Sequence, residues 1–206
     1  MIVNNIYHND IPPNIKFGKS IAIDTEALGL NINRDRLCLA QMCDDKQNVY
    51  FIKFDGNDYS APNFRKILED ESILKIFHFA RVDVAALCHY LNVPKINNIF
   101  CTKIASKLVR TYTDSHGLKS ICKELLNVEL EKESQTSYWG GEYLTEKQKK
   151  YAASDVLYLH EIHAILAKRL EIHKRTEIAQ AFFDVLHTVC KCDIIGFDSA
   201  SIINHH

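Results

Sequence analysis

The chain has 206 residues, of which 47% are hydrophobic and 25% are charged. This composition is typical of a globular protein with enough apolar residues for a full core, and we expect one domain over residues 1–206. The formal net charge of −1 argues against a protein that coats long nucleic acids, because such proteins usually carry a large basic excess.

The sequence has no apolar run near the roughly 20 residues that are needed to cross a bilayer. Its N-terminus has no basic region followed by an apolar stretch, so we expect no signal peptide and a cytoplasmic protein without membrane contact. Among the seven cysteines, the pair of Cys190 and Cys192 has no second pair that would complete a zinc site. Reduced thiols fit a cytoplasmic location.

The first half of the chain is predicted to begin with strands. Residues 19–26 alternate apolar and polar side chains, which is typical of a half-buried strand. Two further strands are predicted at 36–43 and 48–54, separated by the turn-like DDKQ. A helix, a strand, a helix and a strand are then predicted at about 61–69, 74–79, 82–91 and 98–101.

The rest of the chain is predicted to be helical. A long helix follows Thr145, which can act as its N-cap with Gln148 closing a capping box, and it is predicted to reach Leu170. Three strands followed by alternating helices and strands predict an α/β fold, with a mixed five-stranded sheet flanked by helices. The first three strands should form an antiparallel meander, and the later two should pair in parallel. The other predicted helices cover about 102–110, 118–127 and 176–189.

Two carboxylates share one face of the first predicted strand. Asp24 and Glu26 are two residues apart, and side chains at i and i+2 of a strand point the same way. Like charges side by side are costly unless a cation lies between them. The alternative is an ordinary charged strand end that emerges into solvent.

Further candidate residues lie on the predicted helices. Tyr151 and Asp155 are four residues apart and share one helix face, although a surface pair on an amphipathic helix is the alternative. Asp83 lies where a helix starts, so it could instead be an N-cap.

The four carboxylates, taken together, indicate metal chemistry. Coming from three elements, they could converge on two divalent cations, which form a clamp for in-line displacement at phosphorus. A set of oxygen ligands without cysteine or histidine favours Mg²⁺ or Mn²⁺ over zinc. Between Lys95 and Lys123 the chain also has six basic residues and one acid, which indicates either a phosphate-binding stretch or a solvated helix face.

The sequence resembles a known superfamily along nearly its whole length. The segments AIDTEALGL, FHFARVD and YAASDVLYL resemble, in order and in context, the three motifs of the DEDDy exonucleases, whose best-known branch is ribonuclease D. The segment FCTKIASKLVRTYTDSHGLKSICKELLNV and the QTSYW at 135–139 resemble the short bacterial branch called nano-RNase C. The resemblance implies a ribonuclease-H-like exonuclease fold, which agrees with the α/β pattern, and two divalent cations.

The motifs also imply roles for single residues. Asp24, Glu26 and Asp155 would hold the first metal ion, and Asp24 would bridge to the second ion, which Asp83 supports. Tyr151 would hydrogen-bond the attacking water. An unperturbed tyrosine has a pKa near 10, so orienting the water suits it better than acting as a general base.

Four more residues are candidates for substrate contacts. Leu30 has the spacing of the leucine that wedges between the two 3′-terminal bases in related oligoribonucleases, with a core leucine as the alternative. His78 opens the second motif and is either a substrate contact or a hydrogen-bonded histidine at a strand end. Arg110 and His116 are candidates for gripping the 5′ phosphate of a dinucleotide.

The resemblance implies a single 3′→5′ exonuclease domain that removes nucleoside 5′-monophosphates from very short RNAs and prefers dinucleotides. One alternative is a broader exonuclease that trims tRNA ends or single-stranded DNA. Another is a catalytically silent nucleic-acid-binding module, which the intact set of acids argues against. Nano-RNase C proteins form closed ring-like homo-oligomers, so the resemblance implies a ring here; an octamer is one size that it allows, and the sequence does not fix the number of subunits. The segment CDIIGFDSASII is apolar enough to lie at such a contact.

Overall fold

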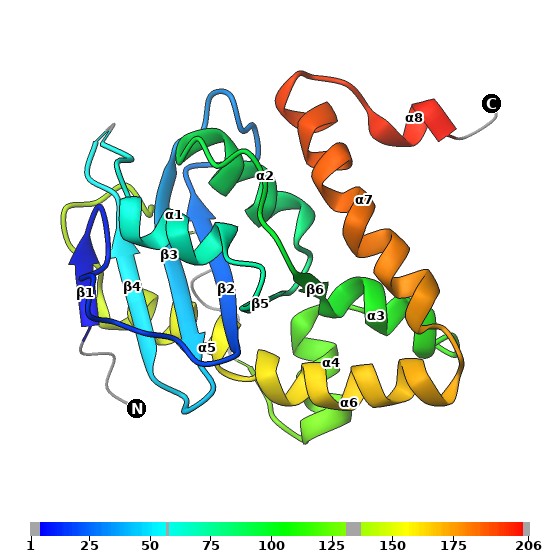
Figure 1. The fold of residues 1–206 in the computed structure, drawn as a ribbon. Helices are drawn as coiled ribbons and strands as arrows, with labels where there is room; N and C mark the ends of the chain where they lie inside the picture. The colour runs from blue at the N-terminus through cyan, green and yellow to red at the C-terminus, as the bar shows by residue number, and fades with distance from the viewer. Residues whose placement is uncertain (1–4, 57, 131–136, 204–206) are drawn as a thin grey trace.

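The computed structural model of the chain (Figure 1) describes residues 5–56, 58–130 and 137–203. Gln135 and Thr136, the first residues of the QTSYW segment, therefore lie outside the described residues. At the centre is a six-stranded mixed sheet with the order β1-β4-β3-β2-β5-β6. Its strands are β1 (Asn5–His8), β2 (Ser20–Ala27), β3 (Leu37–Asp44), β4 (Val49–Lys53), β5 (Leu74–Phe77) and β6 (Ile99–Cys101).

The pairing of the strands confirms the predicted topology. Strands β2, β3 and β4 form an antiparallel meander. Strands β5 and β6 extend the sheet from β2, and both pair in parallel. All eight residues of β3 are buried, because the strand lies inside the sheet and helices pack on it. The sheet therefore places the acidic face of β2 next to its best-buried strand.

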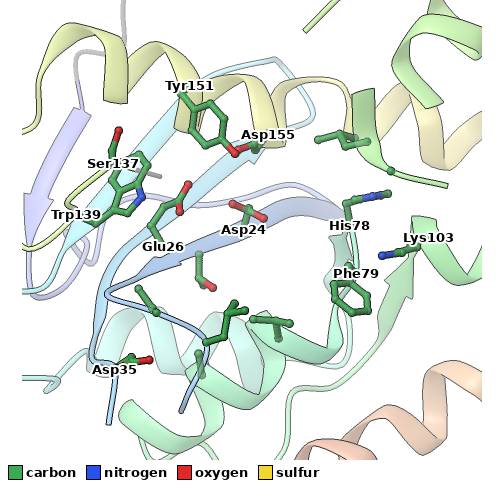
Figure 2. A pocket seen from close by; sticks show the side chains of 18 of the residues that line it. Asp24, Glu26, Asp35, His78, Phe79, Lys103, Ser137, Trp139, Tyr151 and Asp155 are labelled. Carbon is green, nitrogen blue, oxygen red and sulfur yellow. The ribbon is translucent and has the colours of Figure 1, made fainter. Parts of the chain in front are cut away.

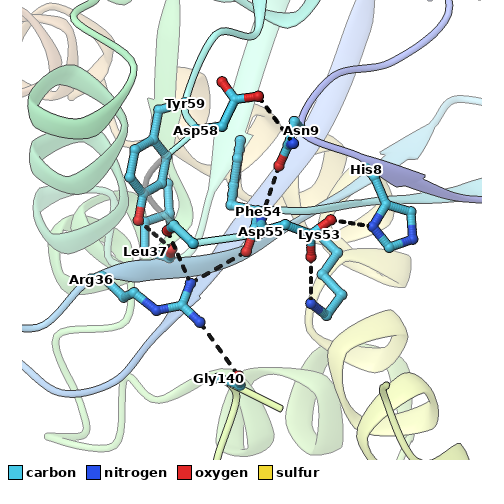
Figure 3. Close-up of polar contacts among 11 residues, drawn as sticks. His8, Asn9, Arg36, Leu37, Lys53, Phe54, Asp55, Asp58, Tyr59 and Gly140 are labelled. Carbon is cyan, nitrogen blue, oxygen red and sulfur yellow. Dashed lines mark hydrogen bonds and ion pairs between the residues drawn. The ribbon is translucent and has the colours of Figure 1, made fainter. Parts of the chain in front are cut away.

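The prediction of five strands missed β1, which pairs in parallel with β4 at the edge of the sheet. The segment NIYH has no alternation of apolar and polar residues, so nothing local marks it as a strand. Contacts with the end of β4 hold it in place (Figure 3). The backbone N–H of Asn9 donates to the carbonyl of Lys53 at 2.9 Å, and the His8 ring shares a hydrogen bond with Asp55.

Helices cover the sheet and extend it at the β6 edge. Figure 1 shows α1 in front of the sheet and α5 behind it, while α3, α4 and α6 lie together beyond β6. The last long helix, α7, packs along α2. The bounds are α1 (Pro62–Glu69), α2 (Arg81–Tyr90), α3 (Thr102–Val109), α4 (Leu118–Leu126), α5 (Glu146–Leu157), α6 (Leu159–Ile172), α7 (Thr176–Ile194) and α8 (Ser199–Ile203).

The predicted long helix from Thr145 to Leu170 is in fact two helices, so that prediction was wrong. Its start is as predicted, because Thr145 and Gln148 form the capping box, with the Thr145 hydroxyl accepting from the Gln148 backbone N–H at 3.2 Å. Helix α5 ends at Leu157, and α6 begins after Tyr158, whose φ is −95° and ψ is −3°. No proline or glycine occurs between 146 and 172, so the break has no local signal. It lets α5 pack on β2 and β3 while α6 packs against α3.

The C-terminal helix is longer than predicted. Helix α7 continues to Ile194 rather than ending near 189. Among the residues that the structure describes, no helix combines the length and the apolar character that crossing a membrane requires.

Candidate active site

Strand β2 presents Asp24 and Glu26 on one face, as the i, i+2 spacing predicts. The strand is fully buried from Ile21 to Ile23 and becomes half-buried at Asp24. Asp24 therefore lies where the strand leaves the core. Opposite it on β3, the buried Gln41 donates from Nε2 to the Asp24 carboxylate.

Helix α5 brings Tyr151 and Asp155 to the same place. One carboxylate oxygen from each of Asp24, Glu26 and Asp155 lies within 4.8 Å of the others. The Tyr151 hydroxyl hydrogen-bonds to Asp155, four residues later on the same helix face. Figure 2 shows all four side chains pointing into one cavity. The three carboxylates supply only oxygen ligands, at a separation that fits a divalent cation between them.

Asp83 belongs to the same charge cluster but occupies a different position. It lies in the first turn of α2, it is only 4% exposed, and its Oδ1 accepts a hydrogen bond from the Thr25 hydroxyl at 2.7 Å. Thr25 separates Asp24 from Glu26 on β2, so Asp83 lies behind the strand segment that carries both acids. The structure thus brings all four predicted carboxylates into one cluster, in which Asp83 lies behind β2 and the other three line the cavity.

Without a cation, this cluster is electrostatically costly. Burial raises the pKa of Asp24 well above its usual range, and the neighbouring carboxylates raise it further. Burial, followed by repulsion from Asp155 and Asp83, raises the pKa of Glu26 to about 9. Burial also raises the pKa values of Asp83 and Asp155 to about 7. A positive charge among them would remove this cost, which is the behaviour expected of metal ligands.

Tyr151 keeps its proton in this setting. Burial, followed by the charges of Asp155, Glu26 and Asp24, raises its pKa above the ordinary value for tyrosine. Its hydroxyl is therefore a hydrogen-bond donor at neutral pH. This favours the predicted role of orienting water over the role of a general base.

A cavity of about 1080 Å³ opens in front of these residues. Leu30 lies on its wall and is 89% exposed, which excludes the alternative of a core leucine. Phe79 also lines the cavity, with a φ of 66° that bulky residues rarely adopt. The Lys103 ammonium lies 3.7 Å from the centre of the Phe79 ring, an arrangement that is typical of a cation–π contact.

His78 lines the cavity and offers it a hydrogen-bond acceptor. Its Nδ1 lies 2.9 Å from the Thr102 hydroxyl, and that hydroxyl donates to the carbonyl of Phe77 at 3.1 Å. Because the hydroxyl hydrogen is engaged, Thr102 accepts from His78, and Nδ1 carries the ring proton. Burial and the nearby Lys103 lower the pKa of His78 to about 3, so the ring is neutral. Its Nε2 therefore suits a hydroxyl or amino group better than a phosphate.

Arg110 and His116 do not reach the cavity. The Arg110 side chain is 1% exposed and forms an ion pair with Glu124, while its Nη1 donates to Ser106 and to the Ser115 carbonyl at 2.9 and 2.8 Å. His116 is buried against the same Ser106 hydroxyl at 2.9 Å. Both residues hold the connection between α3 and α4. The prediction that they grip a 5′ phosphate does not fit this structure.

Sequence reasoning missed several residues around the acids. Gln41 is a polar residue inside an apolar strand, RLCLAQMC, and that contrast could have marked it. Lys103 belongs to the basic stretch between Lys95 and Lys123, but no sequence pattern distinguishes it from the other basic residues there. Trp139 lines the cavity next to Glu26 (Figure 2); it belongs to the QTSYW segment, whose resemblance to nano-RNase C assigns it no role in the site.

Comparison with known proteins agrees with this geometry. Residues 8–171 match a family described as 3′-5′ exonuclease. Ribonuclease D from Bartonella henselae is 31% identical over 156 residues, which cover 76% of this chain and 38% of that protein. The chain spans about two fifths of the length of the ribonuclease D relatives that it matches.

Solved structures extend the similarity over the whole chain. Brucella melitensis NrnC superposes with a TM-score of 0.93 and 46% identity, covering 98% of both chains. The same protein bound to pGG and with bound Mg²⁺ superposes with TM-scores of 0.92 and 0.91. Escherichia coli RNase D superposes with a TM-score of 0.73 at 25% identity, covering 84% of this chain and 45% of that one. These matches confirm the resemblance to ribonuclease D and nano-RNase C, and with it the predicted fold class. The chain belongs to the 3′-5′ exonuclease family.

Proposed function

We propose that this protein is a metal-dependent 3′→5′ exoribonuclease that releases nucleoside 5′-monophosphates from very short RNAs and prefers dinucleotides. The observation that carries the proposal is the convergence of Asp24, Glu26 and Asp155 within 4.8 Å, with the protonated Tyr151 beside them. Family membership supports hydrolysis from the 3′ end. We also propose that residues 1–206 act as one exonuclease domain in the cytoplasm, where its seven free cysteines would stay reduced.

The acids would hold two divalent cations, Mg²⁺ or Mn²⁺. Asp24, Glu26 and Asp155 would bind the first ion, and Asp24 with the support of Asp83 would bind the second. When bound, such a pair of ions activates water and stabilises the leaving oxygen in a displacement at phosphorus. The similarity to NrnC with bound Mg²⁺ supports this choice of metal. The Tyr151 hydroxyl, which also hydrogen-bonds to Asp155, would hydrogen-bond the attacking water and so fix the direction of attack.

Three observations favour a short RNA as substrate. A net charge of −1 gives little long-range attraction to a polyanion, so additional phosphates should add little affinity. The cavity of about 1080 Å³ has the size of a large small-molecule site rather than of a long groove. His78 offers an acceptor that suits a ribose hydroxyl. Leu30 would separate the two terminal bases. Lys103, one of the lysines that line the cavity, replaces Arg110 as the candidate for a phosphate contact. The similarity to NrnC bound to pGG supports the same substrate class.

A length series of labelled RNAs, from two to about twenty nucleotides, tests this substrate preference. With Mg²⁺ or Mn²⁺ present, kcat/KM should be highest for the dinucleotide and should fall as the chain grows. Matched DNA substrates should be poorer than the RNAs. A kcat/KM that is equal or rising from two to ten nucleotides would favour the broader trimming exonuclease. Binding without turnover at any length would favour the silent module.

We propose in addition that the protein forms a closed homo-oligomer. Helix α7 exposes Ile178, Phe182 and Val185, which lie at positions i, i+4 and i+7 and therefore form one apolar stripe. The opposite side of the helix is buried against the rest of the chain. A stripe of large apolar side chains is costly in water and is typical of a protein contact surface. The exposed Phe197, beyond α7, continues the apolar surface toward the C-terminus.

Light scattering at micromolar concentration tests the assembly. The wild-type mass should be a multiple of the 23.7 kDa chain. Phe182→Glu places a charge in the middle of the stripe and should shift the mass toward the monomer. Thr188→Glu, at an exposed polar position of the same helix, should leave the mass unchanged. A monomeric wild-type protein contradicts the proposal.

A further inference from the structure

The single tryptophan of the chain, Trp139, has an unusual environment. Its side chain is 3% exposed, and its Nε1 is buried without a hydrogen-bond partner among the residues that the structure describes. A buried N–H without a partner is costly, because it has lost its water and gained nothing in return. Trp139 also lines the cavity of the candidate active site. The missing partner is therefore to be sought in whatever enters that cavity.

The chain holds the tryptophan firmly on both sides. The carbonyl of Tyr138 accepts a hydrogen bond from Gln148 Nε2 at 3.1 Å, and Gln148 belongs to the capping box of α5. The carbonyl of Gly140 accepts from Arg36 Nη2 at 3.4 Å, and Arg36 also donates to the carbonyl of Phe54 at 3.3 Å (Figure 3). Because the backbone is held on both sides of Trp139 and its side chain is buried, the indole cannot readily turn to another partner. Its N–H is therefore preorganised to donate a hydrogen bond to a ligand.

The neighbours of the indole decide what kind of ligand group it can meet. Figure 2 shows the indole nitrogen on the side of the ring that faces Glu26, and the Trp139 and Tyr151 ring centres are 6.1 Å apart. As a metal ligand Glu26 would be ionised, and its carboxylate would then disfavour a phosphate at this end of the cavity, because like charges repel. Lys103, which also lines the cavity, lies on the other side of Asp24, where a phosphate fits better (Figure 2). An indole N–H only donates and an ionised carboxylate only accepts, whereas a hydroxyl does both.

We propose that the Trp139 N–H donates to a ribose hydroxyl of the 3′-terminal nucleotide, and that the same hydroxyl donates to Glu26. This inference rests on the proposed exonuclease function, since it assigns one contact within that site. It makes Trp139 a substrate-binding residue that contacts the sugar of the 3′-terminal nucleotide. The 3′-terminal nucleotide is the one nucleotide whose 3′ hydroxyl is free, so the contact would also help to select chain ends.

The wild-type protein allows a direct test, because its one tryptophan gives one indole N–H resonance in a ¹⁵N-correlated NMR spectrum. The probe is a 5′-phosphorylated diguanylate, added with Ca²⁺ in place of Mg²⁺ to slow turnover. We expect the indole N–H resonance to move downfield and its exchange with water to slow. Probes that lack the terminal 2′ or the terminal 3′ hydroxyl identify the acceptor, because one of them should not produce the shift. An unmoved resonance at saturation, with binding measured independently by calorimetry, overturns the inference.

A functional test replaces Trp139 with benzothienylalanine, which keeps the shape of the ring and puts sulfur where the N–H was. We expect kcat/KM for the diguanylate to fall about tenfold, as for the loss of one hydrogen bond to a substrate. The loss should vanish for the probe that lacks the contacted hydroxyl. An active wild type with an equally active isostere would defeat this inference alone. A wild type that hydrolyses no RNA would defeat the proposed function as well.

Discussion

Asp24→Asn should lower turnover of a short RNA to at most about one thousandth of the wild-type rate. Asp24 interacts with the other three carboxylates, so its loss would weaken both proposed metal positions at once, and even a single preorganised donor is worth about 10²–10³ in rate. Asparagine keeps the shape of the side chain and can still accept from Gln41. The measurement is kcat on the dinucleotide with saturating Mg²⁺. Asp45→Asn, at an exposed position, is the matched control and should retain full activity.

Without metal, the stability of the wild-type protein should fall as pH rises. In the folded chain the pKa of Glu26 is about 9 and those of Asp83 and Asp155 are about 7, all above their values in an unfolded chain. The folded state therefore binds these protons more tightly, and that contribution to stability is lost as pH rises through about 7 and then 9. The metal-free wild type should melt at a lower temperature at pH 9 than at pH 5.

Asp24→Asn removes one of the repelling charges, so its metal-free melting temperature at pH 8 should exceed that of the wild type. Adding Mg²⁺ should raise the wild-type melting temperature far more than that of the variant.

Excess chelator should abolish wild-type turnover, because no other charge in the cluster can replace the cations. Activity that persists in chelator would falsify the metal-dependent function.

Tyr151→Phe should lower kcat by about 10²–10³-fold, as for removal of one donor that is oriented toward the reacting group. The substitution keeps the ring against Trp139 and removes only the hydroxyl that bonds to Asp155. Because this hydroxyl is meant to orient water rather than to hold RNA, KM should change little. The kinetics are measured on the same dinucleotide at pH 7.

Tyr143→Phe provides the matched control, since Tyr143 is 79% exposed. Its kcat should equal that of the wild type. The pH profile separates orientation from base catalysis: a tyrosine that orients water in its protonated form predicts the same profile for wild type and Tyr151→Phe. Full activity of the Tyr151→Phe variant would remove the hydroxyl from the mechanism.

The sequence by itself determined the features that depend on local geometry. The spacing of Asp24 and Glu26 places both on one strand face because strands repeat every two residues. The spacing of Tyr151 and Asp155 does the same on a helix, which repeats every 3.6 residues. The start of α5 followed from the capping box at Thr145, whose hydrogen bonds lie within one turn. Such contacts need no knowledge of the rest of the chain.

Only the tertiary structure decided the features that depend on which segments meet. Arg110 looked like a free cation, but Glu124 on the next helix pairs with it and buries it. The break at Tyr158 and the edge strand β1 have no local signal, because packing against α3 and pairing with β4 create them. The same holds for the unpaired N–H of Trp139 beside Glu26, since the energy of a buried polar group depends on neighbours that are distant in sequence.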